Sequence, residues 1–292
     1  MKKLKTFYDD RQSVEKNNSF SPSAGKPAKL IEQLTNKKIP VEITSFEPCT
    51  KEDLKLIHNG KYIDGLFNGT SPNGFGNTDI AIAESVLWTT GSIVSATMYA
   101  LKHKENTFSP TSGFHHATQS SGGAFCTVNG LMVAAIKALA AGAIKVGILD
   151  LDAHYGNGQV DIINKLGLQD VVQNYCFSGN CDSSKHANKW LAQLPFVIKS
   201  MRDCSVIIFQ AGADPYINDP LGGILTMEQL KLRDQIVFRE AQQLGIPVAH
   251  NLAGGYTNPF SEVLEIHENT VLMSLEYPQK NKNQPREVKC TK

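Results

Sequence analysis

The sequence predicts a single α/β domain, in which a mostly parallel, multi-stranded sheet is covered by helices on both faces. Strand-like and helix-like segments alternate over the second half of the chain, a pattern typical of parallel sheets. The strand-like segments are solidly apolar, as in strands buried on both faces. Four of them end in acidic, histidine, glycine or tyrosine residues, and sites in such sheets form at the carboxyl ends of strands. The 292 residues, 41% hydrophobic, can bury a sizeable core.

The first half of the chain is mainly helical by pattern. Thr50, followed by Asp53 three residues later, is a helix-start signal. The run from Ile80 to Lys104 predicts one long buried helix. In order, we expect a loop at 9–26, a helix at 26–37, a strand at 39–46, a helix at 50–58, a loop at 67–78, the helix at 80–104 and a loop at 108–125.

The second half supplies the alternation. A helix ends at Gly142, and Pro195 is an unusual residue within another predicted helix. We expect helices at 126–142, 158–167, 183–201, 226–245 and 259–274, and strands at 145–152, 171–177, 205–212 and 246–252. The predicted domain covers residues 1–278, and a polar tail follows at 279–292.

Charge, the N-terminal sequence and the cysteine content disfavour a nucleic-acid-binding, secreted or membrane protein. The net charge of +1 gives no basic field that would favour nucleic acid. The start, MKKLKTFYDD, lacks the apolar stretch of a signal peptide, and we expect no membrane-spanning segment. The six cysteines are scattered, which favours reduced thiols and a cytoplasmic location. Cys176 and Cys181 form only a weak metal-binding pattern.

The stretch ILDLDAHYGNG carries the strongest chemical signal. Because side chains alternate along a strand, Asp150, Asp152 and His154 project the same way. Asp152 and His154 can converge on one cation, and Asp214, at the end of another strand, can supply a third ligand. Two carboxylates and one histidine with an open position suit hydrolytic zinc, and also iron or other divalent metals. The alternative interpretation is that the aspartates cap the next helix and that His154 is an ordinary core residue.

Two further motifs hold groups suited to proton transfer and hydrogen bonding. GFHHA places His115 and His116 together in a Gly/Ser-rich loop, where a neutral imidazole could take a proton from water and return it to a leaving amine. AGGY places Tyr256 after two glycines, from where its phenol could reach a carbonyl oxygen. Alone, each motif is weak, because histidine pairs on surfaces and packed tyrosines are common.

Together these motifs resemble the zinc-dependent histone deacetylase family, which has the arginase–deacetylase fold. The resemblance spans roughly residues 21–260 and keeps the family's order of motifs. The matching segments are SPSAGKPAKL (21–30), HNGKYIDGL (58–66), TTGSIVSA (89–96), GFHHA (113–117), AFCTVNGLMVAA (124–135), ILDLDAHYGNG (148–158), QAGADPYINDPLGG (210–223) and LAGGY (252–256).

The resemblance implies a mechanism and a set of site residues. Zn²⁺ would be held by Asp152, His154 and Asp214. His116 would be the general base and then the acid, with Asn157 behind it, and His115, oriented by Asp150, would stabilise charge. Tyr256 would hydrogen-bond the scissile carbonyl. A channel lined by Ala124, Phe125, Gly254 and Gly255 would receive the acylated amine, and K⁺ would be held by Asp150, Asp152, His154 and Ser178.

Several positions depart from the family's pattern. Tyr155 stands where many members have a second histidine, and Asn157 where some have aspartate. Ala124 replaces a glycine, and Lys29 stands for an expected arginine. The segment between Ser178 and Asp214 is shorter than in typical members and lacks their second channel aromatic residue.

We therefore expect a zinc-dependent deacylase that removes an acetyl or short acyl group from an amine such as acetyl-lysine or an acetylated polyamine. One rival is a binding module that keeps the fold with little turnover. The other is a two-metal ureohydrolase, but Gly156 and Gly212 stand where that class needs acids. The natural substrate, the acyl length, the physiological metal and the oligomeric state stay open.

Overall fold

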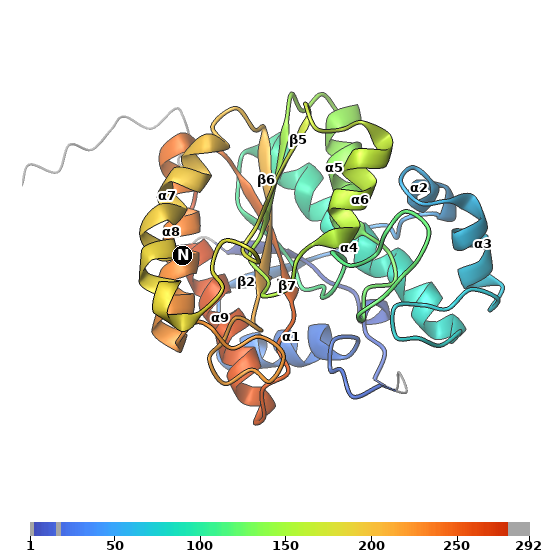
Figure 1. Cartoon of the computed structure of the whole chain (residues 1–292), viewed down its shortest axis with the longest axis horizontal. Coiled ribbons are helices and arrows are strands. Elements are labelled where there is room, and N and C mark those ends of the chain that lie inside the picture. Colours follow the sequence, from blue (N-terminus) through green and yellow to red (C-terminus); the bar gives the residue numbers. More distant parts are fainter. Residues whose placement is uncertain (1–2, 16–18, 280–292) are drawn as a thin grey trace, which may run out of the picture.

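The structure, a computed structural model, describes residues 3–15 and 19–279. Within these residues the chain forms one sheet of seven parallel strands in the order β2-β1-β3-β7-β6-β4-β5, with helices on both faces (Figure 1). The predicted fold class is confirmed. The predicted tail at 279–292 falls almost entirely outside the described residues, so the limits of the domain stay a prediction.

The central strands are short, apolar and fully buried. β6 lies between β4 and β7, and all three consist of buried residues. In chain order the strands are β1 (Leu4–Phe7), β2 (Val41–Thr44), β3 (Thr107–Ser109), β4 (Val146–Asp150), β5 (Val172–Cys176), β6 (Val206–Gly212) and β7 (Val248–Ala253). Burial on both sides explains why their sequences are continuous apolar runs rather than alternating ones.

The helices fall into two layers. The first layer packs on Ile148 and Ile208 and contains α2 (Lys51–Lys55), α3 (Gly60–Phe67), α4 (Ile80–His103), α5 (Gly130–Ala140) and α6 (Asn157–Leu166). The opposite face of the sheet presents Leu149 and Phe209 to α7 (Ala187–Ser200), α8 (Met227–Leu244) and α9 (Phe260–Glu276), and α1 (Lys26–Asn36) completes that layer beside β1. In Figure 1 the sheet, seen nearly edge-on, separates α7 and α8 from α4, α5 and α6.

Most elements lie within a few residues of their predicted bounds, but three were missed. β1 and β3 are short, and their pairing with neighbouring strands, rather than their own sequences, defines them. The helix expected at 50–58 ends at Lys55, and the separate helix α3 begins after Asn59, whose side chain accepts a hydrogen bond from Lys61 N. Pro195 lies inside α7 without ending it.

Helix α4 is long and apolar enough to span a membrane by length and composition, although we expected no such segment. In the structure, 56% of its apolar window is buried, and it packs against α5, β3 and β7. The core helix of a globular protein passes the same test.

Candidate metal centre and catalytic site

The predicted site residues come together at the carboxyl ends of four adjacent strands. The loop after β3 carries His115 and His116, and the segment after β4 carries Asp152 and His154. Asp214 follows β6, and the tyrosine loop follows β7. Because parallel strands all end at the same edge, segments far apart in sequence form one site there.

Asp152, His154 and Asp214 form a compact group of potential metal ligands. One ligand atom from each lies within 4.8 Å of the others, and this is the one such group found within residues 3–15 and 19–279. His154 Nδ1 lies 2.7 Å from Asp214 Oδ2 and 3.1 Å from Asp152 Oδ1. Both carboxylates are buried, with exposures of 0% and 2%. Within the described residues Asp214 Oδ2 has no well-directed hydrogen bond. A buried carboxylate oxygen of this kind fits a cation.

Close backbone packing fixes the two carboxylates. A Cβ atom at Gly212 would lie 2.4 Å from Asp152 Cα, so only glycine lets the ends of β4 and β6 approach this closely. A Cβ at Gly254 would lie 2.3 Å from the Asp214 carboxyl carbon, and this glycine has a φ of +46°. Glycine is therefore required on both sides of the ligand group.

The two histidines of GFHHA have different partners. His115 Nδ1 donates to Asp150 Oδ2 over 2.9 Å, and His116 Nδ1 donates to Asn157 Oδ1 over 2.6 Å. Because an amide oxygen only accepts, the proton of a neutral His116 ring sits on Nδ1 and Nε2 is free to accept another. The two rings lie 4.0 Å apart, centroid to centroid.

The surroundings separate the pKa values of these two histidines. Burial lowers the pKa of His115, but the charges of Asp150 and Asp152 outweigh burial and raise it to about 9. Burial, followed by the charge of His115, lowers the pKa of His116 below its ordinary value. At neutral pH this pattern favours a charged His115 beside a neutral His116, which suits an electrostatic role for the first and a base for the second.

Asp150 has two partners that sequence reasoning missed. Gln159 Nε2 donates to its Oδ2 over 2.7 Å, and Gln210 Nε2 approaches its Oδ1 at 3.3 Å. Asp152 N also donates to Asp150 Oδ1 over 3.3 Å. The sequence signal was a single polar residue, Gln210, inside the apolar run of β6. These bonds hold the Asp150 carboxylate in place for His115.

Two buried groups that the sequence analysis did not select anchor the tyrosine loop. Asp219 Oδ2 accepts a 2.6 Å hydrogen bond from Tyr256 N. The fully buried Lys26 donates to Gly254 O, and burial lowers its pKa to about 8. Lys29, noted in the sequence as standing for an arginine, instead places its Nζ 5.1 Å from the ring centre of Phe260. Burial raises the pKa of Tyr256, which keeps its phenol protonated as a donor.

A cavity of about 100 Å³ leads to this site. Its lining includes Ala124, Phe125, Gly254 and Tyr256, whereas Gly255 packs towards Val263 and is not among the lining residues. Ala124 and Phe125 both adopt positive φ values, +44° and +66°. Such strained backbone at non-glycine residues is common at functional sites.

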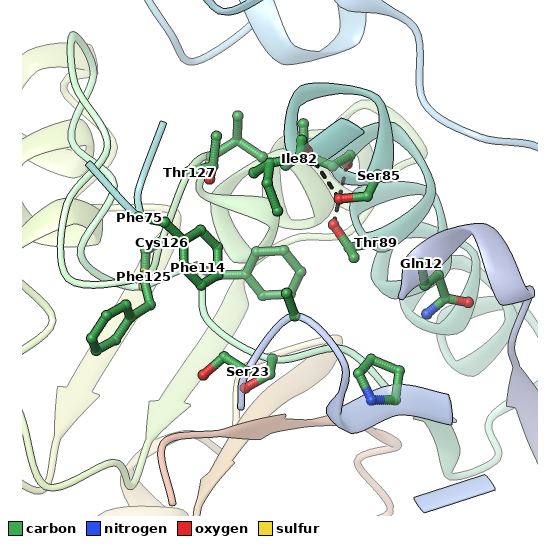
Figure 2. A pocket seen from close by; sticks show the side chains of 15 residues that line it. Gln12, Ser23, Phe75, Ile82, Ser85, Thr89, Phe114, Phe125, Cys126 and Thr127 are labelled. Atoms are coloured by element: carbon green, nitrogen blue, oxygen red, sulfur yellow. Dashed lines mark hydrogen bonds between the residues drawn. The ribbon is translucent and has the colours of Figure 1, made fainter. Parts of the chain in front are cut away.

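A third aromatic ring packs against Phe125 and Tyr256, which line this cavity. The ring of Phe20, which is 75% exposed, lies 5.3 Å from that of Phe125 and 6.3 Å from that of Tyr256. A second cavity of about 40 Å³ shares Ser23, Phe125 and Cys126 with the first and extends towards Ser85 and Thr89 of α4 (Figure 2).

The predicted monovalent-cation residues lie around the ends of β4 and β5. Phe177 N donates to Asp150 O over 2.8 Å, and Ser178 follows directly in the chain. Cys176 pairs with Asp150 in the sheet register. This arrangement brings Ser178 to the segment that also carries Asp152 and His154.

Comparison with known proteins points to one family. The Histone deacetylase domain matches residues 22–178, more than half of the chain. Histone deacetylase 2 of Arabidopsis thaliana is 25% identical over 285 residues, which cover 86% of this chain and 73% of that protein. The acetylpolyamine amidohydrolase of Mycoplana ramosa is 45% identical over 53 residues, 18% of this chain and 16% of that protein.

Solved structures agree on the fold. The HD domain of HDA15 superposes with a TM-score of 0.76 at 18% identity, over 98% of this chain and 90% of that one. The acetylpolyamine aminohydrolase of Burkholderia pseudomallei gives a TM-score of 0.72 at 15% identity, over 93% and 98%. The structural likeness includes the second half of the chain, beyond the matched domain.

Proposed function

The chain belongs to the histone deacetylase family, and from that premise we propose that it is a zinc-dependent deacylase. It would hydrolyse the amide of an acetyl or short-acyl amine, such as acetyl-lysine or an acetylated polyamine. The observation that supports this most directly is the group of Asp152, His154 and Asp214 beside the histidine pair that lines the cavity.

The donor set suits a divalent cation. Asp152, His154 and Asp214 would hold the ion, and two carboxylates with one imidazole are compatible with zinc and also with iron. When bound, such an ion polarises a carbonyl group and lowers the pKa of water. We also propose K⁺ as a second, structural ion near Asp150, Asp152, His154 and Ser178.

The side chains around the ligand group divide the proton chemistry between them. His116 Nε2 accepts the proton of the attacking water and later donates it to the leaving amine. Asn157 fixes the tautomer that this step requires. The charged His115, held by Asp150, stabilises negative charge that develops on the substrate.

Tyr256 and Phe125 would orient the substrate. The phenol of Tyr256 donates a hydrogen bond to the carbonyl oxygen, and this bond strengthens as the oxygen becomes negative. Phe125 packs along the alkyl chain of the amine and excludes water from the cavity.

Metal content and acetate release test the proposal together. Purified protein loaded with Zn²⁺ should retain about one ion per chain, because the described part of the chain has one group of three ligands. It should also release acetate from an acetyl-lysine peptide. His116→Ala should keep the ion and lose turnover. Wild-type protein that holds zinc but hydrolyses no member of a panel of acyl-lysine peptides and acylated polyamines would favour the binding-module alternative.

Local packing disfavours a two-metal ureohydrolase. A Cβ at Gly156 would lie 2.7 Å from Asp150 Oδ2, and one at Gly212 would meet the Asp152 backbone. Neither position has room for the acidic side chain that a second ion would need there.

The remaining sequence predictions concern the setting of the reaction. We propose a cytoplasmic enzyme that acts on acylated amines and binds neither nucleic acid nor membranes. The five cysteines in the described part of the chain are free and buried, which supports a reducing location. Activity in a soluble cell fraction, with none in a membrane pellet, is the expected result of fractionation.

A further inference from the structure

Arg233 in α8 is a fully buried charge outside the proposed catalytic group. Its side chain is 0% exposed, and it lies behind the site on the face of the sheet that α8 covers. Arginine is among the residues least often buried completely, and a buried guanidinium needs specific partners. The partners of Arg233 lie next to the metal-ligand group.

Arg233 bridges the two segments that carry the ligands. Its Nη1 donates to Leu151 O over 3.2 Å and to Gly212 O over 2.6 Å. Leu151 directly precedes Asp152, and Gly212 is two residues before Asp214. One nitrogen therefore joins the end of β4 to the end of β6 immediately before their ligands.

A second chain of contacts holds the guanidinium in place. Arg233 Nε donates to Asp234 Oδ1 over 2.7 Å, and Thr270 Oγ1 of α9 donates to Asp234 Oδ2 over 2.6 Å. Asp234 is 1% exposed, so its carboxylate balances the buried charge. Arg233 is thus held on both sides. Asp234 connects it to α9, and its Nη1 connects it to the ends of β4 and β6.

Gly212 limits how closely the ends of β4 and β6 can approach each other. Its Cα packs so closely against Asp152 that a Cβ would lie 2.4 Å from Asp152 Cα. Gly212 sets how near the two segments can come. The bridge from Arg233, which acts just beyond the last backbone hydrogen bond of the pair, from Leu151 N to Gln210 O over 3.0 Å, opposes their moving apart. The separation of Asp152 and Asp214 is therefore bounded from both directions.

We propose that Arg233 is a positioning residue that fixes the spacing of Asp152 and Asp214 and thereby sets the affinity of the site for a divalent cation. The inference rests on the proposed metal-dependent function. Groups that orient ligands from behind typically contribute 10- to 100-fold to metal affinity. Arg233 acts through the carbonyls of Leu151 and Gly212 and touches no reacting atom.

The test is a competition titration of the metal-free protein with Zn²⁺ against a chromophoric chelator, which measures affinity without turnover. Arg233→Met should weaken zinc binding by about 10- to 100-fold. Arg233→Lys keeps a charge but reaches the carbonyls with a single amino group, so it should fall between Arg233→Met and wild type. If Arg233→Met does not fold, the zinc affinity of Arg233→Lys still tests the inference.

Two controls separate positioning from general destabilisation. Arg239→Met removes another arginine of α8, whose guanidinium bonds to Glu240 and not to the strand ends, and should bind zinc like wild type. Leu230→Ala removes a buried apolar side chain from the same helix and should lower the melting temperature without weakening zinc binding.

The outcomes are distinct. Wild-type affinity in folded Arg233→Met or Arg233→Lys would overturn the inference while leaving the proposed function intact. An equal loss of affinity in Leu230→Ala would also overturn it, because any loosening of α8 would then suffice. A wild-type protein that binds no zinc would contradict the proposed function itself.

Discussion

Asp214 illustrates how a single side chain joins two distant parts of the sequence. It follows β6, yet its carboxylate lies 2.7 Å from His154 Nδ1, which follows β4. We expect Asp214→Ala to abolish retention of a divalent ion and with it hydrolysis, because one of three ligands is lost. Metal analysis after gel filtration measures this, with Asp182→Ala, at an exposed acid, as the matched control. Full metal content in Asp214→Ala would rule out the proposed ligand group.

The proposed role of Tyr256 leads to a prediction that does not depend on metal retention. Tyr256→Phe removes only the phenol oxygen, so the bound ion should stay while kcat falls by an amount equivalent to about 2–4 kcal/mol of transition-state stabilisation. Tyr155→Phe, at a half-exposed tyrosine beside His154, should leave kcat unchanged. Steady-state kinetics decide, and an unaltered kcat in Tyr256→Phe would remove that residue from the mechanism.

The pair of His116 and Asn157 predicts the pH dependence. His116 acts as a base only when neutral, and its pKa is lowered, so kcat/KM should hold on acidification until pH falls below the ordinary histidine value. Asn157→Asp places a carboxylate 2.6 Å from the ring, stabilises the imidazolium and should move this acid limb to higher pH. A pH–rate profile of each protein measures the acid limb. A shift of this limb towards lower pH in Asn157→Asp would contradict the assignment.

The sequence indicated the candidate reactive residues more readily than the residues that hold them. Alternation along a strand predicted that Asp150, Asp152 and His154 share one side, but β4 ends at Asp150, and a bend at residues 152–154 positions Asp152 and His154. Asp219 and Lys26 could not be found this way, because each acts on a group remote in sequence through a contact that only the folded chain creates. Gln159 lies nine residues after Asp150, but no sequence pattern shows that its side chain turns back to that carboxylate.

At the scale of elements, the loops after β3, β4, β6 and β7 depend on glycine where two backbones meet. Gly254→Ala would place a Cβ against the Asp214 carboxylate and should sharply weaken metal binding. Gly245→Ala is the matched control: Gly245 has a φ of +70°, but nothing lies within 4 Å of its added Cβ. The control should lose only about 1–2 kcal/mol of stability from left-handed backbone and keep its metal affinity. Equal metal affinities in the two variants would contradict the close contact at Gly254.

Long elements were easier to predict than short ones. Helix α4 and strands β4 and β6 have enough periodic or apolar sequence to define themselves. β1, LKTF, reads as part of a charged terminus, and β3 has three residues within what looks like a loop. Pairing with partners more than thirty residues away along the chain determines such strands, as for Leu4 with Val41.

At the scale of the whole molecule, the site links metal binding to folding. The ligands follow two different strands, so an unfolded chain cannot present them together, and zinc should stabilise the folded state by linkage. At a free zinc concentration about a thousand times the dissociation constant, this amounts to roughly 4 kcal/mol, or a rise in Tm on the order of 10 °C. Thermal unfolding with zinc and with a chelator measures the shift, which should vanish in Asp214→Ala. A Tm that does not respond to zinc in wild-type protein would contradict the linkage.

The overall architecture followed from the sequence because parallel sheets covered on both faces leave a strong pattern of apolar runs. The order of strands did not, since the pattern shows which segments are strands but not which lie side by side. The expected ligand group implied that the ends of β4 and β6 are neighbours, but the full order of the seven strands emerged only in the structure.

The spread of the site over the chain has a consequence for its biosynthesis. A ribosome delivers Asp152 and His154 first, Asp214 some sixty residues later and Tyr256 last. Until β6 has docked beside β4, the nascent polypeptide offers an incomplete chelate. Ion capture is therefore a late event in the production of this protein, and a translation product that stops before residue 214 would retain no ion.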